Sequence, residues 1–186
     1  LLGERGVKWS LNTAIMPGKE VRKAVAANPP SFVAVSLDGP AKLHDRFRGK
    51  VGACKESLEA IRFFSSLNGC QVAAGTTVTS RNYGGLSETL GLVADSGADS
   101  WGIHLLVPEG RAKERDDLFL SRRQLSGLVK FVAQKRSYFP VNMADEIGYC
   151  GDLEPMLRDV PLACGAGRAQ CVVLPDGEVV PCTTLD

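Results

Sequence analysis

The chain has 186 residues, of which 44% are hydrophobic and 23% are charged, and its net charge at pH 7 is +1. These values are ordinary for a globular protein that buries a core, and the near-neutral charge argues against a nucleic-acid-binding surface. No apolar run approaches the roughly 18 residues of a membrane span, and the first ten residues lack the basic-then-apolar order of a signal peptide. We therefore expect a cytoplasmic protein that binds neither membranes nor nucleic acid.

Apolar runs rich in β-branched residues alternate with helical patterns over most of the chain. We predict strands at residues 7–13, 32–38, 71–79, 101–107 and 141–145, and helices at about 18–27, 58–67, 86–94 and 125–132. The predicted strands are nearly continuous apolar runs, as is typical of parallel strands covered on both faces. This alternation predicts a parallel α/β architecture, and it leaves open whether the sheet is doubly wound or part of a barrel.

The pattern changes after Glu146 to a loop-like segment rich in glycine and cysteine. Residues 172–174 and 179–180 flank the turn sequence Pro175-Asp176-Gly177, which predicts a β-hairpin. We place a domain boundary near Ile147.

The six cysteines are unevenly spaced, and their spacing bears on whether they bind a metal or form disulfides. Four of them crowd the end of the chain, at Cys150, Cys164, Cys171 and Cys182. In a chain that otherwise has the pattern of a cytosolic enzyme, such a cluster favours metal binding over disulfides. Thiolates select iron–sulfur clusters or zinc. The isolated Cys54 and Cys70 flank a predicted helix, where we expect them in the core.

Polar residues follow the predicted strands, where ligands bind in parallel α/β folds. Ser36 and Asp38 are two apart and project to the same side, so they suit the hydroxyls of a sugar, and Arg48 suits a ligand carboxylate. The alternative is that Ser36 and Asp38 only cap the next turn. His104 is one of two histidines. A lone strand histidine is more often a hydrogen-bonded wall residue than a catalyst.

Four stretches carry a resemblance to a known family. Residues 36–40 (SLDGP) with 44–49 (HDRFRG), residues 77–79 (TVT) with Asn82, residues 108–112 (PEGRA), and the series Cys164, Gly177, Cys182 follow one another in order. Together they resemble radical S-adenosylmethionine (SAM) enzymes with a SPASM-type iron–sulfur domain, such as peptide maturases and anaerobic sulfatase maturases. The resemblance implies a partial parallel (β/α) barrel in residues 1–147 and the start of a SPASM-type domain with a β-hairpin in residues 148–186.

The resemblance also implies roles for individual residues. Ser36 and Asp38 would contact the ribose of SAM, Thr13 would line the same pocket, and Arg48 would reach the methionyl part. Leu106 would flank the adenine through its backbone. The implied ligands of an auxiliary [4Fe–4S] cluster are Cys164 and Cys182, with Cys171 and Cys150 as further candidates.

Two family motifs are absent from these 186 residues, namely the CxxxCxxC that holds the SAM-cleaving cluster and the GGEP stretch. Both would precede Leu1, so we expect a fragment that lacks radical chemistry by itself. The family's TNG is altered here to Thr13-Ala14-Ile15. The parent enzyme would use SAM and [4Fe–4S] clusters to abstract hydrogen from a peptide or protein, with electrons from a flavodoxin or ferredoxin.

Two other interpretations stay open at this point. The chain is alternatively a non-catalytic, degenerate barrel whose cysteines hold a structural zinc and which binds peptides. The third interpretation is an ordinary α/β barrel enzyme with incidental cysteines, which the spacing at the end of the chain disfavours.

Overall fold

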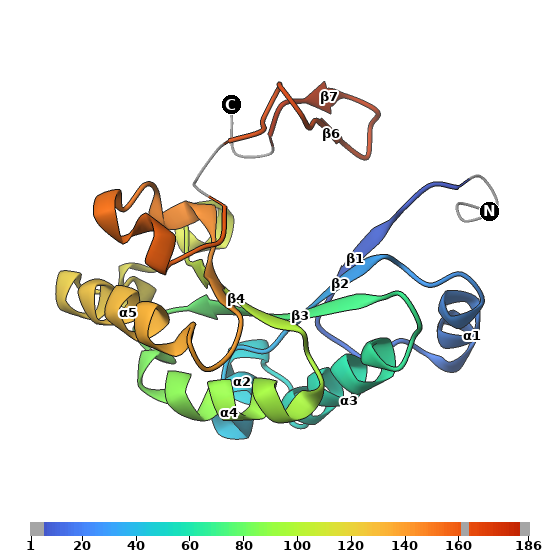
Figure 1. Ribbon diagram of the computed structural model, residues 1–186, viewed down its shortest axis with the longest axis horizontal. Helices are drawn as coiled ribbons and strands as arrows, with labels where there is room; N and C mark the ends of the chain where they lie inside the picture. Colours follow the sequence, from blue (N-terminus) through green and yellow to red (C-terminus); the bar gives the residue numbers. More distant parts are fainter. Residues whose placement is uncertain (1–5, 161–163, 183–186) are drawn as a thin grey trace.

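A computed structural model describes residues 6–160 and 164–182 of the chain, and its main feature is one parallel sheet (Figure 1). Each strand pairs with the next along the chain, so the order in the sheet follows the sequence without reversal. An unreversed order is that of a barrel wall, whereas a doubly wound sheet reverses at a switch point. The strands are β1 (Ser10–Thr13), β2 (Phe32–Ser36), β3 (Gln71–Val78), β4 (Ser100–Leu105) and β5 (Val141–Met143).

The helices that connect these strands gather on one side of the sheet, as α1, α3 and α4 show in Figure 1. The other side of the sheet is the concave face of the partial barrel. None of the helices in the described ranges is long and apolar enough to cross a membrane. The helices are α1 (Lys19–Ala27), α2 (Ala41–Arg48), α3 (Ala53–Ser65), α4 (Leu86–Ser96) and α5 (Arg122–Lys135).

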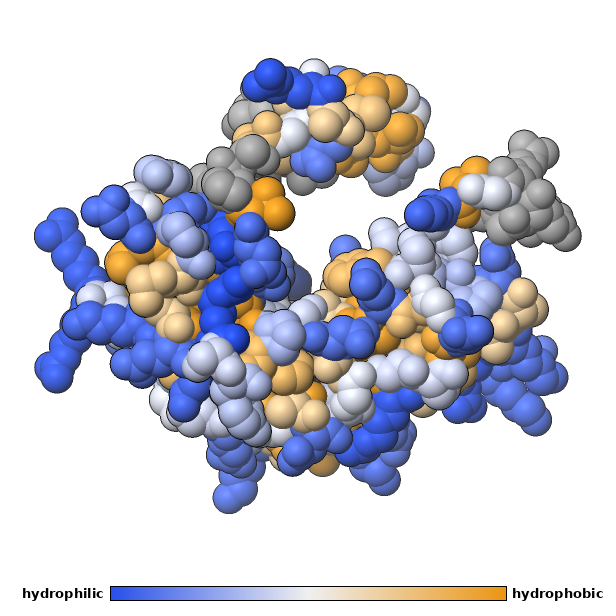
Figure 2. All heavy atoms as spheres, viewed as in Figure 1, coloured by the Kyte–Doolittle hydropathy of each residue, from blue (hydrophilic) through white to orange (hydrophobic). Residues whose placement is uncertain are grey.

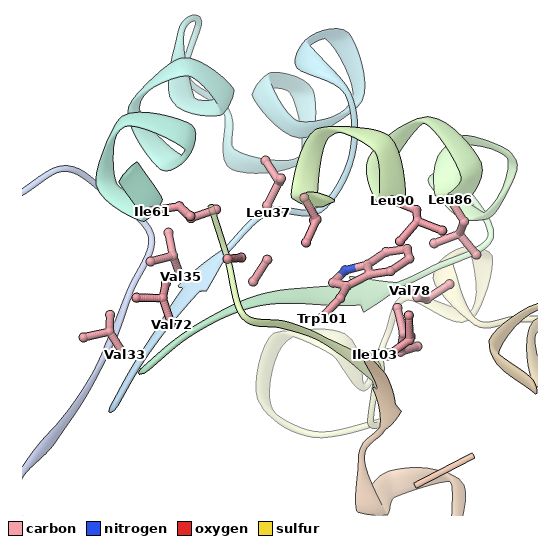
Figure 3. Close-up of a cluster of buried hydrophobic side chains, with 14 of the residues drawn as sticks. Val33, Val35, Leu37, Ile61, Val72, Val78, Leu86, Leu90, Trp101 and Ile103 are labelled. Carbon is pink, nitrogen blue, oxygen red and sulfur yellow. The ribbon is translucent and has the colours of Figure 1, made fainter. Parts of the chain in front are cut away.

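The core lies between the sheet and the helices (Figure 3). Every second strand residue points into it, including Val33 and Val35 of β2, and they meet helix residues such as Ile61. Trp101 is fully buried and its indole nitrogen donates to the Thr76 hydroxyl at 2.8 Å. That pairing removes the cost of burying an unsatisfied polar group. Because successive side chains of a strand point to opposite faces of the sheet, the remaining side chains point to the concave face.

The five predicted strands are confirmed, with ends that differ by up to three residues. One helix was missed, because α2 has the polar sequence AKLHDRFR and buries only His44. Such a helix shows no apolar period in the sequence. It ends at Gly49, whose positive φ of 65° suits a glycine.

The segment after β5 returns to the body of the fold before the hairpin. Leu157 is fully buried, and its carbonyl accepts a hydrogen bond from the Met143 N–H at 3.0 Å. The predicted hairpin is confirmed as the antiparallel pair β6 (Val172–Val173) and β7 (Val179–Val180). The domain boundary near Ile147 stays a prediction, and the packed body extends to Arg158.

Two helix glycines form a matched pair that tests the packing of α5. A Cβ at Gly91 in α4 would meet nothing within 4 Å, whereas a Cβ at Gly127 in α5 would collide with the hydroxyl of Tyr83. We expect Gly91→Ala to raise the free energy of unfolding by about 0.5–1 kcal/mol, since alanine is the better helix former. Gly127→Ala should be less stable than Gly91→Ala, because the Tyr83 hydroxyl must move to admit the new Cβ. Urea denaturation of both variants measures this, and equal stabilisation of the two would contradict the packing.

Candidate functional site

The carboxylate of Asp38, which follows β2, lies at the junction of three elements. The residue is 1% exposed. Its Oδ1 accepts a hydrogen bond from the Thr77 N–H of β3 at 3.0 Å, and its Oδ2 lies 2.8 Å from Nε and 2.6 Å from Nη2 of Arg48 in α2. Both oxygens are therefore occupied within the protein, and Asp38 ties together the ends of β2, β3 and α2.

Asn82 reinforces the same junction from the segment after β3. Its amide nitrogen donates to the carbonyls of Asp38 at 2.8 Å and Thr77 at 2.9 Å, and its oxygen accepts from the Thr79 N–H at 2.7 Å. The residue is buried, so these bonds are shielded from water. The TVT-with-Asn stretch thus has a structural function in this chain.

His44 and Asp45 of α2 complete the junction. The Nδ1 of buried His44 accepts a hydrogen bond from the Asp38 N–H at 2.8 Å, so the ring hydrogen lies on Nε2, which is 3.3 Å from the Ser57 hydroxyl. Burial lowers the pKa of His44 below its ordinary value and keeps the ring neutral. Asp45 accepts from the N–H groups of Gly52 at 2.6 Å and Cys54 at 2.8 Å, at the start of α3.

A cavity of about 250 Å³ opens on the concave face. The space-filling view shows the molecule hollowed on this side (Figure 2). Apart from His104, the groups that line the cavity are small or polar and carry no charge. The lining consists of Asn12, Ala34, Val35, Ser36, Gly75, Thr77 and His104. The chemistry of the cavity suits hydroxyl and amide groups of a ligand.

His104 is the ionisable residue of this cavity, and it has a partner. Its Nδ1 lies 3.1 Å from Oε1 of Glu146, in the segment after β5. That hydrogen bond raises the pKa of His104 above its ordinary value, against the opposing effect of burial. Burial would raise the pKa of Glu146, but the hydrogen bond from His104 helps to bring it below the ordinary value. The pair is therefore ionised more readily than either group alone.

The residues predicted to contact SAM are distributed over several places. Ser36 lines the cavity, while Asp38 lies beneath its rim with both oxygens occupied and Arg48 is its partner. Thr13 is in register with Val35 on the helix-covered face and bonds to the backbone of Ile15, whereas its neighbour Asn12 lines the cavity, because successive side chains of a strand alternate. The role of Thr13 at SAM stays a prediction.

Leu106 lies in a separate hollow of about 130 Å³ with residues from the segment before α5. It is therefore not brought to the concave cavity with Ser36. Asn12, Thr77 and His104 are cavity residues to which no ligand role was given. They can be identified because they point to the same face of the sheet as Ser36, at an even number of residues along the paired strands. This requires the pairing of the strands to be known.

The cysteines do not converge in the described part of the chain. Cys164 and Cys171 are exposed, and Cys150 and Cys182 are half-buried. Among residues 6–160 and 164–182, no three His, Cys, Asp or Glu side chains group as a metal site. The four predicted ligands stay a prediction. Cys54 lies in the core as expected, and burial raises the pKa of its thiol.

A larger cavity of about 570 Å³ lies apart from the concave face, beside α2. Arg46, Arg81 and Arg115 line it, and the last two both pair with Asp117. The hydrogen bond from Arg115 is the main reason that the pKa of Asp117 falls to about 2. These groups are exposed, so their pairing contributes little to stability.

The junction can be tested by substituting Asp38. We expect Asp38→Asn to lower the free energy of unfolding by about 3 kcal/mol, because Arg48 loses its charged partner and a buried amide cannot accept all three bonds. Glu20→Gln is the matched control, since Glu20 pairs with Lys23 on the exposed surface of α1. That change should cost less than about 0.5 kcal/mol. Urea denaturation of both variants gives the comparison, and equal effects would contradict the structural function of Asp38.

The neutral His44 makes the fold sensitive to acid. Because the folded state holds the pKa of His44 below its ordinary value of 6.5, stability is fully present above pH 6.5 and is lost as the pH falls through the folded pKa. In His44→Asn, whose amide oxygen still accepts a hydrogen bond, this component of the pH dependence should vanish. Denaturation midpoints between pH 7.5 and 5 measure it, and identical pH profiles would refute the assignment.

Comparison with known proteins places the chain among characterised relatives, although no family model matches it. It is 28% identical over 201 aligned positions to the AdoMet-dependent heme synthase of Nitratidesulfovibrio vulgaris, covering 99% of this chain and 54% of that protein. It is 31% identical to the mycofactocin maturase MftC of Mycolicibacterium smegmatis, covering 95% of this chain and 45% of the maturase.

Solved structures agree in fold. Streptococcus suis SuiB bound to S-adenosylmethionine superposes with a TM-score of 0.65 over 98% of this chain and 44% of SuiB, at 14% identity. SuiB bound to its precursor peptide SuiA gives a TM-score of 0.68, at 12% identity and over 97% of this chain and 44% of SuiB. The chain spans about half the length of the curated relatives that it matches along most of its residues.

Proposed function

Because the chain has the radical SAM fold and radical SAM maturases are among its homologues, we propose that the protein containing it is a radical SAM enzyme that modifies a peptide. The observation that carries this proposal is the cavity on the concave face, at the carboxyl ends of parallel strands. The relationship agrees with the motifs at residues 36–49, 77–82 and 108–112. It disfavours the interpretation as an ordinary α/β barrel enzyme with incidental cysteines.

The residues of the cavity fit part of a nucleoside ligand. Ser36, Thr77 and Asn12 offer uncharged donors and acceptors for hydroxyl groups and ring nitrogens. We assign Ser36 to direct contact with SAM, and we assign Asp38 and Arg48 to holding the strand end that carries it. When bound and reduced, SAM supplies a radical that removes a hydrogen atom from the substrate, while the residues of this chain position the ligand and exclude water.

A peptide is the proposed substrate because the relatives include maturases, and SuiB has been solved with a precursor peptide. A flavodoxin or ferredoxin is the proposed electron donor, since the reductive step needs one electron at a time. The proposed domain division, 1–147 and 148–186, puts the cysteine-bearing hairpin in a separate unit.

The proposed cluster ligands Cys150, Cys164, Cys171 and Cys182 have the soft donors that iron–sulfur clusters need. In the described ranges they do not assemble into a metal site, so we assign no reaction step to a cluster held by them.

The test of the proposal is SAM cleavage by the protein that contains this chain. After anaerobic reconstitution with iron and sulfide, we expect the absorbance of iron–sulfur clusters at about 400 nm. After reduction with dithionite, we expect formation of 5′-deoxyadenosine. Metal analysis accompanies the assay. A colourless protein with bound zinc and no 5′-deoxyadenosine would overturn the proposal and favour a structural zinc site in a peptide-binding module.

Ser36 gives a residue-level prediction for the same protein. Ser36→Ala should weaken SAM binding by roughly fivefold, the loss of about one net hydrogen bond, without changing the thermal midpoint. Ser66→Ala is the matched control, because Ser66 lies at the end of α3 and its hydroxyl donates to the Phe63 carbonyl. Isothermal titration with SAM measures both. Unchanged affinity in Ser36→Ala would remove Ser36 from the binding site.

A further inference from the structure

His104 presents one ring nitrogen to the concave cavity. Its side chain is 46% exposed, and its Nδ1 lies 3.1 Å from Oε1 of Glu146. Since a carboxylate only accepts hydrogen bonds, Nδ1 carries the hydrogen, and the second nitrogen of the neutral ring has an available lone pair. Within residues 6–160 and 164–182, Nε2 has no hydrogen-bond partner. A histidine oriented by a carboxylate in this way is suited to accept a proton.

Two glycines lie beneath the imidazole ring. A Cβ at Gly102, on the same strand as His104, would lie 3.4 Å from Nε2, and a Cβ at Gly75 on β3 would lie 4.0 Å from it. Gly75 and Gly102 are paired in the sheet register, so together they form one flat patch of the cavity floor that carries no side chains. The ring rests over this patch, close to Ser36 and Thr77 in the cavity lining. Its position is therefore set on two sides, by Glu146 and by the floor.

The surrounding charges favour the protonated ring. Glu146, Asp38 and Asp145 all raise the pKa of His104, with the hydrogen bond to Glu146 as the largest cause. Asp38 is paired with Arg48, and Asp145 lies 3.4 Å from Arg158. The raised pKa makes the neutral ring a stronger proton acceptor than an ordinary histidine.

We propose that His104, oriented by Glu146, is the proton-accepting residue of the concave cavity and takes a proton from an N–H or O–H group of the ligand bound there. The inference rests on the proposed function for the presence of a ligand in this cavity. Peptide amides, amines and ribose hydroxyls all carry such groups.

The step is balanced within the protein and its ligand. The N–H or O–H bond of the ligand breaks, a new N–H bond forms at Nε2, and the bonding electron pair stays on the ligand atom. Glu146 stabilises the imidazolium that results. Because the side chain is half-exposed, the proton passes to solvent afterwards.

Diethyl pyrocarbonate tests the inference, because it acylates the accessible, unprotonated nitrogen of histidine. The chain has two histidines, so buried His44 serves as an internal control. Of these two histidines, we expect acylation at His104 alone, located by mass spectrometry, with a rate that rises with pH through the pKa of His104. In Glu146→Gln the midpoint of that rise should be lower, because the largest cause of the raised pKa is removed. Glu114→Gln, an exposed change in the segment before α5, should leave it in place.

A second variant keeps the test decisive if Glu146→Gln does not fold, as circular dichroism would reveal. Gly102→Ala should slow acylation several-fold by displacing the ring, whereas Gly75→Ala should change it little. An unmodified His104, or equal midpoints in the wild type and Glu146→Gln, would overturn the inference.

Adding SAM to the reconstituted protein separates this inference from the proposed function. Slower acylation with SAM supports SAM binding over His104. If SAM gives no protection while the pH midpoint still moves in Glu146→Gln, the placement of SAM fails and only the orientation of His104 by Glu146 stands. If SAM protects and the midpoint does not move, the proposed function stands and the inference about His104 fails.

Discussion

The buried carboxylate of Asp38 is the interaction on which the concave face depends. It joins the end of β2 to the backbone of β3 and to the guanidinium of α2, at distances between 2.6 and 3.0 Å. Ser36 lies two residues before it and Thr77 is bonded to it, so both cavity residues take their positions from this one group. A charge buried in this way is stable only while its partners are present, which makes the geometry of the cavity sensitive to each of them.

This junction changes how the sequence motifs are understood. In the stretches at residues 36–49 and 77–82, most polar side chains bond to the protein itself: His44 to the Asp38 backbone, Asp45 to the start of α3, and Asn82 to two carbonyls. These residues were chosen from the sequence as ligand contacts or motif markers. They supply the framework, and Ser36 is the one among the predicted contacts that reaches the cavity. A sequence motif indicates that a residue is required, but it does not indicate whether the side chain points into the cavity or bonds within the protein.

The fold was largely predictable because its strands are buried, apolar and regularly separated by helices. Helix α2 was not, since it is held by hydrogen bonds of His44 and Asp45 instead of by an apolar stripe. The cavity was predictable only in its location at the strand ends. Asn12, next to Thr13, lines the cavity, and Gly75 and Gly102 lie together beneath His104 only through strand pairing that local sequence does not encode.

The strand order has a further consequence for the outer members of the sheet. Among the described residues, the outer side of β5 is partly occupied, because the Met143 N–H donates to the Leu157 carbonyl and Arg136 donates to the Val141 carbonyl, whereas the outer side of β1 presents N–H and C=O groups without a strand partner. Such groups are templates for further strands, whether from the remainder of a longer protein or from another copy of the chain. β1 has four residues, so this edge offers few hydrogen bonds to an incoming strand. Closure of the sheet into a cylinder would remove it.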